Sequence, residues 1–199
     1  MKSHKSPNPF LMSALLASVS ANDYKTNDDG SITTGQGITA QGEYFDRING
    51  GEWRATKNLI TDQGLAHILN VALGTTPKPT GYYLALFSAA ATPQSSWTAA
   101  SFASTASEIV SMTEGYSDAT RPKWNPTNAT TNSIDNMTTV AKVTMKTASQ
   151  LTVQGAAMLT NSSRGGTSGV LISATKYAAP RVFQNDDTYE IGYRISLTL

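Results

Sequence analysis

The C-terminal residues carry the strongest constraint on the fold, because apolar and polar side chains alternate there without interruption. Apolar residues occupy every second position, at Tyr189, Ile191, Tyr193, Ile195 and Leu197. Successive side chains of a β-strand point to opposite faces of a sheet, so this period of two predicts a strand with one buried face. A sheet with one buried and one solvated face is typical of antiparallel proteins.

Other segments alternate in the same way or form short apolar runs, and we expect them to be strands too. They span residues 43–48, 82–88, 108–113, 138–147, 151–159 and 170–173. Gly155 lies inside one of these runs and predicts a β-bulge. Many short strands separated by long polar loops predict a mostly β fold, an antiparallel β-sandwich. About eight strands favour its jelly-roll variant.

One short α-helix is predicted after Thr61, which is a suitable N-cap, with Asp62 at the positive end of the helix dipole. Apolar residues at helical spacing follow at Leu65, Ile68, Leu69, Ala72 and Leu73. They form a single stripe, and we expect it to pack against a sheet. His67 lies off the centre of this stripe and is expected at the surface or at the boundary of the core.

The first part of the chain differs from the rest, because its apolar residues are sparse and show no sustained period. We therefore expect an extended N-terminal arm over residues 1–55 and a β-sandwich domain over residues 56–199. The apolar stretch at residues 10–17 is much shorter than the roughly 20 residues that a membrane span needs. A cleaved secretory signal is the alternative interpretation, but we expect the segment to be retained and packed on a partner.

The composition excludes several classes of site. The chain has no cysteine, which rules out a disulfide scaffold, an iron–sulfur cluster and a thiolate metal site. The formal net charge is +1 and no basic stripe is visible, so we expect no nucleic-acid partner. We also expect no metal and no cofactor.

Catalytic patterns are equally scarce. The only histidines are His4 and His67, and no Gly-x-Ser-x-Gly motif occurs. The acidic pairs at 28–29 and 186–187 lie in sequence typical of turns, whereas a glycosidase needs two acids across a cleft. We therefore predict that the protein is not an enzyme.

Apolar and aromatic residues of the expected arm are the candidates for binding another protein. They are Phe10, Leu11, Leu15, Leu16, Tyr44, Phe45 and Trp53. For the aromatic ones two interpretations stay open: they cover sheet edges, or they are contact anchors, since aromatic residues are enriched in interface hot spots.

Several segments of the expected domain match the pattern of a known group of virion proteins. They are residues 57–65, which open the predicted helix; the strand 83–87, which ends in Leu-Phe; residues 116–124, with their Ala-Thr-Arg-Pro-Lys-Trp; and the segments 155–159, 169–172 and 193–197. Residues 56–199 thus resemble the capsid cement, or decoration, proteins of short-tailed phages of the Bordetella phage type.

The resemblance implies a jelly-roll protein on the outer surface of an icosahedral virion capsid, made in the host cytoplasm, which joins neighbouring major capsid proteins. It implies the major capsid protein and a second copy of the chain as partners, in a homodimer, with a trimer left open, and neither nucleic acid nor membrane. The alternative is a tail- or fibre-associated protein whose Trp97 and Trp124 stack on a host surface glycan.

Overall fold

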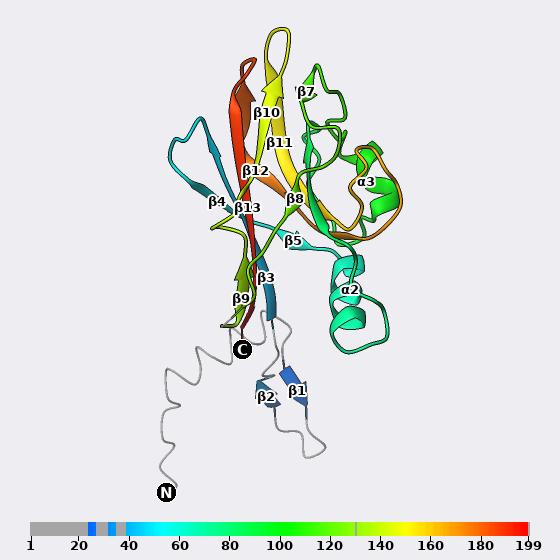
Figure 1. Cartoon of the computed structure of the whole chain (residues 1–199). Helices are drawn as coiled ribbons and strands as arrows, with labels where there is room; N and C mark the ends of the chain where they lie inside the picture. Colours follow the sequence, from blue (N-terminus) through cyan, green and yellow to red (C-terminus); the bar gives the residue numbers. More distant parts are fainter. Residues whose placement is uncertain (1–23, 27–31, 35–38, 130, 199) are drawn as a thin grey trace, which may run out of the picture. The chain divides into compact units, whose positions relative to one another are not determined.

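The computed structural model describes residues 24–26, 32–34, 39–129 and 131–198. The chain divides into two compact units, residues 1–39 with 198–199, and Ala40–Leu197. In the first unit the described residues form an antiparallel pair of short strands, β1 (Tyr24–Thr26) and β2 (Ile32–Thr34). The second unit is a β-sandwich with two helices in its described part (Figure 1).

One sheet of the sandwich has six strands in the order β4-β3-β13-β10-β7, with β9 also paired to β13. These are β3 (Thr39–Ile48), β4 (Arg54–Lys57), β7 (Gly115–Tyr116), β9 (Ser133–Asp135), β10 (Ala141–Lys146) and β13 (Thr188–Thr198). The other sheet has five strands in the order β5-β12-β11-β6-β8. These are β5 (Leu59–Ile60), β6 (Tyr82–Phe87), β8 (Lys123–Trp124), β11 (Leu151–Leu159) and β12 (Leu171–Phe183).

The core lies between the two sheets, and apolar residues at alternate strand positions form it, as predicted. Ile191 and Tyr193 of β13 point inward, as do Val143 and Met145 of β10, and they meet Leu86 from the opposite sheet. The ladders between the strands are antiparallel, and the register of β11 on β12 shifts at Gly155, where a bulge was predicted. The mostly β, antiparallel sandwich is therefore confirmed. The strand order does not establish the jelly-roll variant.

The five-stranded sheet is buried on both faces, because a helix covers its outer side. The helix is α3 (Ala99–Thr105), and its Phe102 packs with Phe87 of β6 and Leu159 of β11. This double burial accounts for the unbroken buried residues of these two strands. The prediction of a single helix is therefore wrong. Thr98 and Ser101 form a capping box that begins α3 in what was expected to be a loop.

The predicted domain boundary at residue 55 is also wrong. The compact unit begins at Ala40, and β3 lies inside the six-stranded sheet between β4 and β13. Tyr44 of β3 is fully buried, with its ring centroid 4.7 Å from that of Tyr193. Asn49 and Gly50 take positive φ angles of 51° and 69° in the turn that leads from β3 to β4. Residues 40–55 are therefore part of the core-forming unit.

The predicted helix is present as α2 (Asp62–Ala72), and Thr61 is its N-cap, accepting a hydrogen bond from the backbone nitrogen of Gly64 at 3.0 Å. The face that it turns to the sheet is not the expected one. Gly64 and His67 are buried, whereas Leu65, Leu69 and Leu73 are exposed. The expectation that these leucines are buried is therefore wrong, whereas His67, expected at the surface or at the boundary of the core, is 8% exposed. Neither helix of the described part is long and apolar enough to cross a membrane.

Candidate interaction surface

The orientation of α2 is fixed by polar contacts of its first turn. The Thr61 hydroxyl donates to the backbone carbonyl of Leu171 at 2.5 Å, and the Gln63 side-chain oxygen accepts from the backbone nitrogens of Leu171 and Ala99 at 2.8 and 3.0 Å. These bonds hold the start of α2 on β12 and on the start of α3. Since they pair buried polar groups, loss of either partner would leave an unsatisfied donor or acceptor.

Gly64 allows α2 to approach the backbone of β12. A Cβ atom at Gly64 would lie 2.1 Å from the carbonyl oxygen of Ile172, which no side chain can tolerate. Three residues further on, His67 faces the same way, and its Nε2 lies 3.1 Å from the hydroxyl of Tyr82. Burial lowers the pKa of His67 from its ordinary value. The close contact at Gly64 determines which side of the helix faces the sheet.

As a consequence, three leucines spaced one turn apart point away from the sandwich. Leu65 and Leu69 of α2 and its C-cap residue Leu73 are 41, 59 and 85% exposed, and we call them the α2 stripe. Leu59 of the edge strand β5 is also exposed. Single exposed leucines are ordinary, but a row of them on one helix face is typical of an interaction site.

A second exposed apolar site lies between α3 and β7, in the segment 107–116. Val110 and Met112 are each about half exposed there. The guanidinium of Arg164 donates to the backbone carbonyls of Ser111 and Tyr116 at 2.6 and 2.9 Å, and it stacks 3.7 Å from the centroid of the Tyr116 ring. The segment therefore presents its two apolar side chains from a fixed backbone.

A buried ion pair supports the same segment from inside. Arg121 and Glu108 form two hydrogen bonds of 2.7 Å, and neither side chain is exposed. Arg121 also donates to the carbonyl of Asn161 at 2.8 Å, and Glu108 accepts from the backbone nitrogen of Gly165 at 3.0 Å. The arginine of the Ala-Thr-Arg-Pro-Lys-Trp sequence thus connects the segment 107–116 to the loop after β11.

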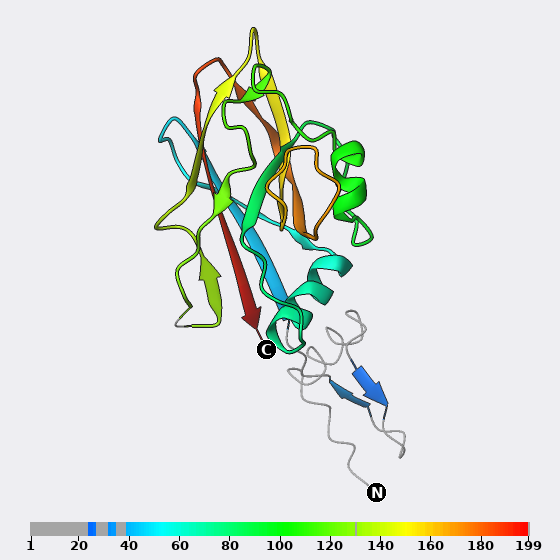
Figure 2. The same cartoon turned by 45° about the vertical axis from the view of Figure 1, so that its right-hand side comes forward.

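The two apolar sites are well separated on the sandwich. α2 lies toward one end of it, and β7, which closes the segment 107–116, lies toward the other (Figure 1). α2 and α3 lie on the same side of the sandwich (Figure 2). A protein with contact sites at two ends can touch two neighbours at once.

Two of the predicted contact residues lie on β3 of the six-stranded sheet and in the turn that follows it. Phe45 is half-buried, with the guanidinium of Arg194 5.0 Å from its ring centroid. Trp53 is 38% exposed, and the guanidinium of Arg47 lies 4.4 Å from its ring. Arg47 in turn pairs with Glu190 at 2.5 Å. Both rings are therefore partly covered by charged side chains of their own chain.

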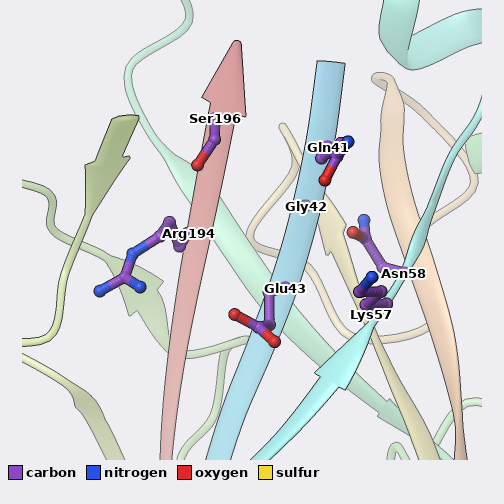
Figure 3. A pocket seen from close by; sticks show the side chains of 7 residues that line it. All are labelled: Gln41, Gly42, Glu43, Lys57, Asn58, Arg194 and Ser196. Carbon is purple, nitrogen blue, oxygen red and sulfur yellow. The ribbon is translucent and has the colours of Figure 1, made fainter. Parts of the chain in front are cut away.

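A small hollow of about 160 Å³ lies on this sheet, where side chains of β3 and β13 and residues 57 and 58 meet (Figure 3). Its lining is Gln41, Gly42, Glu43, Lys57, Asn58, Arg194 and Ser196. Arg194 turns away from Glu43 and binds Asp135 of β9 at 2.9 Å. Among the described residues, no group of three or more histidine or acidic side chains could hold a metal ion.

A larger cleft of about 610 Å³ opens between residues of the two sheets beside α2. Its lining includes Tyr82, Trp124 and Tyr193, whose rings are in edge contact at centroid distances of 5.9 and 6.0 Å. The described residues that line it include Lys78 and Lys123 but neither a carboxylate nor a histidine. It therefore lacks the acid pair that a glycosidase uses.

The residues predicted to contact another protein differ in where the structure places them. Phe10, Leu11, Leu15 and Leu16 lie outside the described residues. Tyr44 cannot be a surface anchor, because it is fully buried and its hydroxyl lies 2.9 Å from that of Ser173. Phe45 and Trp53 remain partly accessible. Trp97 and Trp124, proposed to stack on sugars, are only 7 and 6% exposed, although Trp124 lines the cleft beside α2.

Sequence reasoning missed both apolar sites. The leucines of the α2 stripe were expected in the core, and Val110 and Met112 were expected in a strand. The glycine inside the helix at position 64 is the signal that could have shown which face lies against the sheet, because helix interiors disfavour glycine unless close packing needs it. No protein-family model matches the sequence, and no curated protein is significantly similar to it.

Proposed function

We propose that the protein is a structural virion protein that binds the outside of an icosahedral phage capsid and cements neighbouring major capsid proteins. The observation that supports it best is the pair of separated apolar sites on one framework, the α2 stripe and the segment 107–116. A cement protein needs at least two contact sites, because it works by bridging. The resemblance of residues 56–199 to phage cement proteins agrees with this use.

The chemistry of the described surface favours adhesion over catalysis. Each contact is modest by itself, but many copies bound to one lattice multiply retention through effective concentration. The formal net charge of +1 suits this arrangement, because closely spaced copies repel one another little.

The fixed backbone of the segment 107–116 also suits a bridge that has to resist separation. Arg164 and the buried Arg121–Glu108 pair hold the segment in place, so a force that pulls on Met112 acts on the whole sandwich. A pre-organised contact loses less conformational entropy on binding than a mobile loop does. The predicted anchors at Phe10, Leu11, Leu15 and Leu16 stay predictions for the arm.

The alternative function, a tail- or fibre-associated protein that binds a host glycan, is supported less well. Its argument depended on Trp97 and Trp124, and both rings are buried. Electron microscopy of finished particles separates the two functions. Density over the whole shell agrees with a cement protein, and density confined to the tail contradicts it.

The segment 107–116 can be tested by adding charge to it. We expect Met112→Asp to reduce occupancy on purified capsids at least tenfold and to lower the temperature at which the particles release DNA. Val182→Asp is the control, since Val182 is exposed to a similar degree on another element. Unchanged occupancy of the Met112→Asp variant would show that this segment does not bind the capsid.

A further inference from the structure

We infer that the larger cleft beside α2 binds a long-chain fatty acid, with the hydrocarbon chain between the two sheets and the carboxylate at Lys78 and Lys123. The inference goes beyond the proposed function and does not rest on it. It is drawn from the aliphatic lining of the cleft, from the hydrogen bonds of its aromatic rings and from its charge.

The cleft has aliphatic walls on both sides. Met158 and Ile172 line it from the five-stranded sheet, and both belong to the core between the sheets, where they are 2 and 3% exposed. Ile134 of β9 and Ile195 of β13 line it from the six-stranded sheet. The volume of about 610 Å³ is usual for a small-molecule site, for which the range is roughly 300–1,000 Å³. A hydrocarbon chain in this cleft would therefore be in contact with apolar side chains of both sheets.

The aromatic residues of the cleft favour a hydrocarbon chain over a sugar, because their polar atoms already have partners. The indole nitrogen of Trp124 donates to the backbone carbonyl of Tyr193 at 3.0 Å. The hydroxyl of Tyr193 accepts from the side-chain nitrogen of Asn58 at 3.2 Å, and that of Tyr82 lies 3.1 Å from Nε2 of His67. A sugar hydroxyl turned toward these rings would lose its hydrogen bonds to water and gain few in return, whereas a hydrocarbon chain has none to lose.

The charge of the cleft favours an anionic ligand. Its lining includes Lys78 and Lys123 but no carboxylate, and neither lysine forms an ion pair within the described part of the chain. A Cβ atom at Gly81 would lie 2.8 Å from Cε of Lys123, so the end of this side chain lies against the segment 78–81, which Lys78 begins. Both positive charges are thus associated with one loop, which suits a ligand with a single anionic head and an apolar tail.

Calorimetric titration of the full-length chain tests the class of ligand. Laurate, kept below the concentration at which it forms micelles, should bind, and decanoate, which is two methylene groups shorter, should bind about tenfold more weakly. Dodecylamine and dodecanol carry the same chain with a cationic and a neutral head, and both should bind at least tenfold more weakly than laurate. Equal affinities for laurate and dodecylamine would overturn the inference.

Charge reversal tests where the carboxylate lies. The double variant Lys78→Glu, Lys123→Glu should bind laurate at least tenfold more weakly than the natural chain, with an unchanged circular dichroism spectrum, because both lysines are exposed. The double variant Lys57→Glu, Lys142→Glu is the control, since it changes the net charge equally at two exposed lysines outside the cleft. Equal losses in the two double variants would contradict a head-group site at the cleft.

Methyl resonances in NMR spectra test where the hydrocarbon chain lies. Laurate should shift the methyl resonance of Met158, but not that of Met145, which is buried in the core and does not line the cleft. An unshifted Met158 overturns the inference. So does a Met158 that shifts with maltohexaose and not with laurate, or a chain that binds phosphatidylglycerol vesicles and not free laurate. None of these results bears on the capsid proposal, which the Met112→Asp variant tests separately.

Discussion

The two helices of the described part pack beside the same sheet in opposite ways. α3 turns its apolar side inward, and Phe102 is fully buried against Phe87. α2 turns glycine and histidine inward and leaves the leucines of its stripe in solvent. Both helices begin with a threonine cap, so the difference lies in which face is used and not in how the helix starts.

This contrast separates residues that stabilise the fold from residues available for binding. Burial of Phe102 removes apolar surface from water within one chain, which stabilises the folded state. The α2 stripe contributes less to folding, because much of its side-chain surface remains hydrated. That exposed apolar surface is available to another molecule. We therefore expect substitutions on the buried side of α3 to change the stability of the fold, and substitutions in the α2 stripe to change binding.

The largest expected effect comes from truncating the buried side of α3. Phe102→Ala should lower the free energy of unfolding by about 3–5 kcal/mol, since it leaves a cavity between α3 and the five-stranded sheet. Leu69→Ala, on the outer side of α2, should change it by no more than about 0.5 kcal/mol in the isolated monomer. Urea denaturation at a protein concentration low enough to avoid self-association measures both. Equal losses for the two variants would remove the distinction between the helices.

The next effect concerns the contact that orients α2. Gly64→Ala should lower the free energy of unfolding by about 1–3 kcal/mol, because the new methyl group would meet the Ile172 carbonyl and push the helix off β12. Helix propensity alone predicts the reverse, a gain of about 1 kcal/mol. Asn70→Ala, at an exposed position of the same helix, is the control and should show a gain of a few tenths of a kcal/mol. A stabilised Gly64→Ala variant would mean that the close approach to β12 does not hold in solution.

The strands could largely be predicted from the sequence, because alternation reports directly on sheet faces. β10, β11 and β13 lie where the period of two placed them. Only residues 43–48 of β3 could be predicted from the sequence, and the position of this strand in the core could not be predicted. Asp46 occupies an inward position there and is fully buried, held by Arg181 at 2.9 and 3.0 Å and by Arg54 at 2.6 Å. A buried charge hides the apolar pattern, and Arg181 lies too far along the chain to be recognised as its partner.

The helices show a different limit of sequence reasoning. The existence and the cap of α2 follow from the sequence, but its buried face does not, because that face is determined by a backbone contact with β12 and not by hydrophobicity. α3 is only seven residues long and has few large apolar residues, so its period is too short to detect. The exposed leucines of α2 were not predicted as an interaction surface, because their spacing along the helix is the same as that of residues in a core.

The smallest expected effect is a pH dependence that arises from the inward face of α2. The Nε2 atom of His67 lies 3.1 Å from the hydroxyl of Tyr82, and burial lowers the folded-state pKa of His67 from the unfolded value of about 6.5. As the pH falls below about 6.5, the unfolded chain takes up a proton that the folded chain resists, so the free energy of unfolding decreases. Above that pH the contribution of His67 is fully present.

Denaturation measured between pH 8 and pH 5 tests this effect. The natural chain should lose stability through the lower part of that range, and His67→Gln, which keeps a polar group facing Tyr82, should lose less. His4→Gln is the control for the other histidine of the chain and should behave like the natural protein. The pKa values of Glu114 and Glu190 are lowered because these carboxylates accept hydrogen bonds from Thr147 and Arg47, so their contribution is lost only in more acidic solution. A natural chain and a His67→Gln variant with the same slope would place His67 in water, and the assignment of the inward face of α2 would then be wrong.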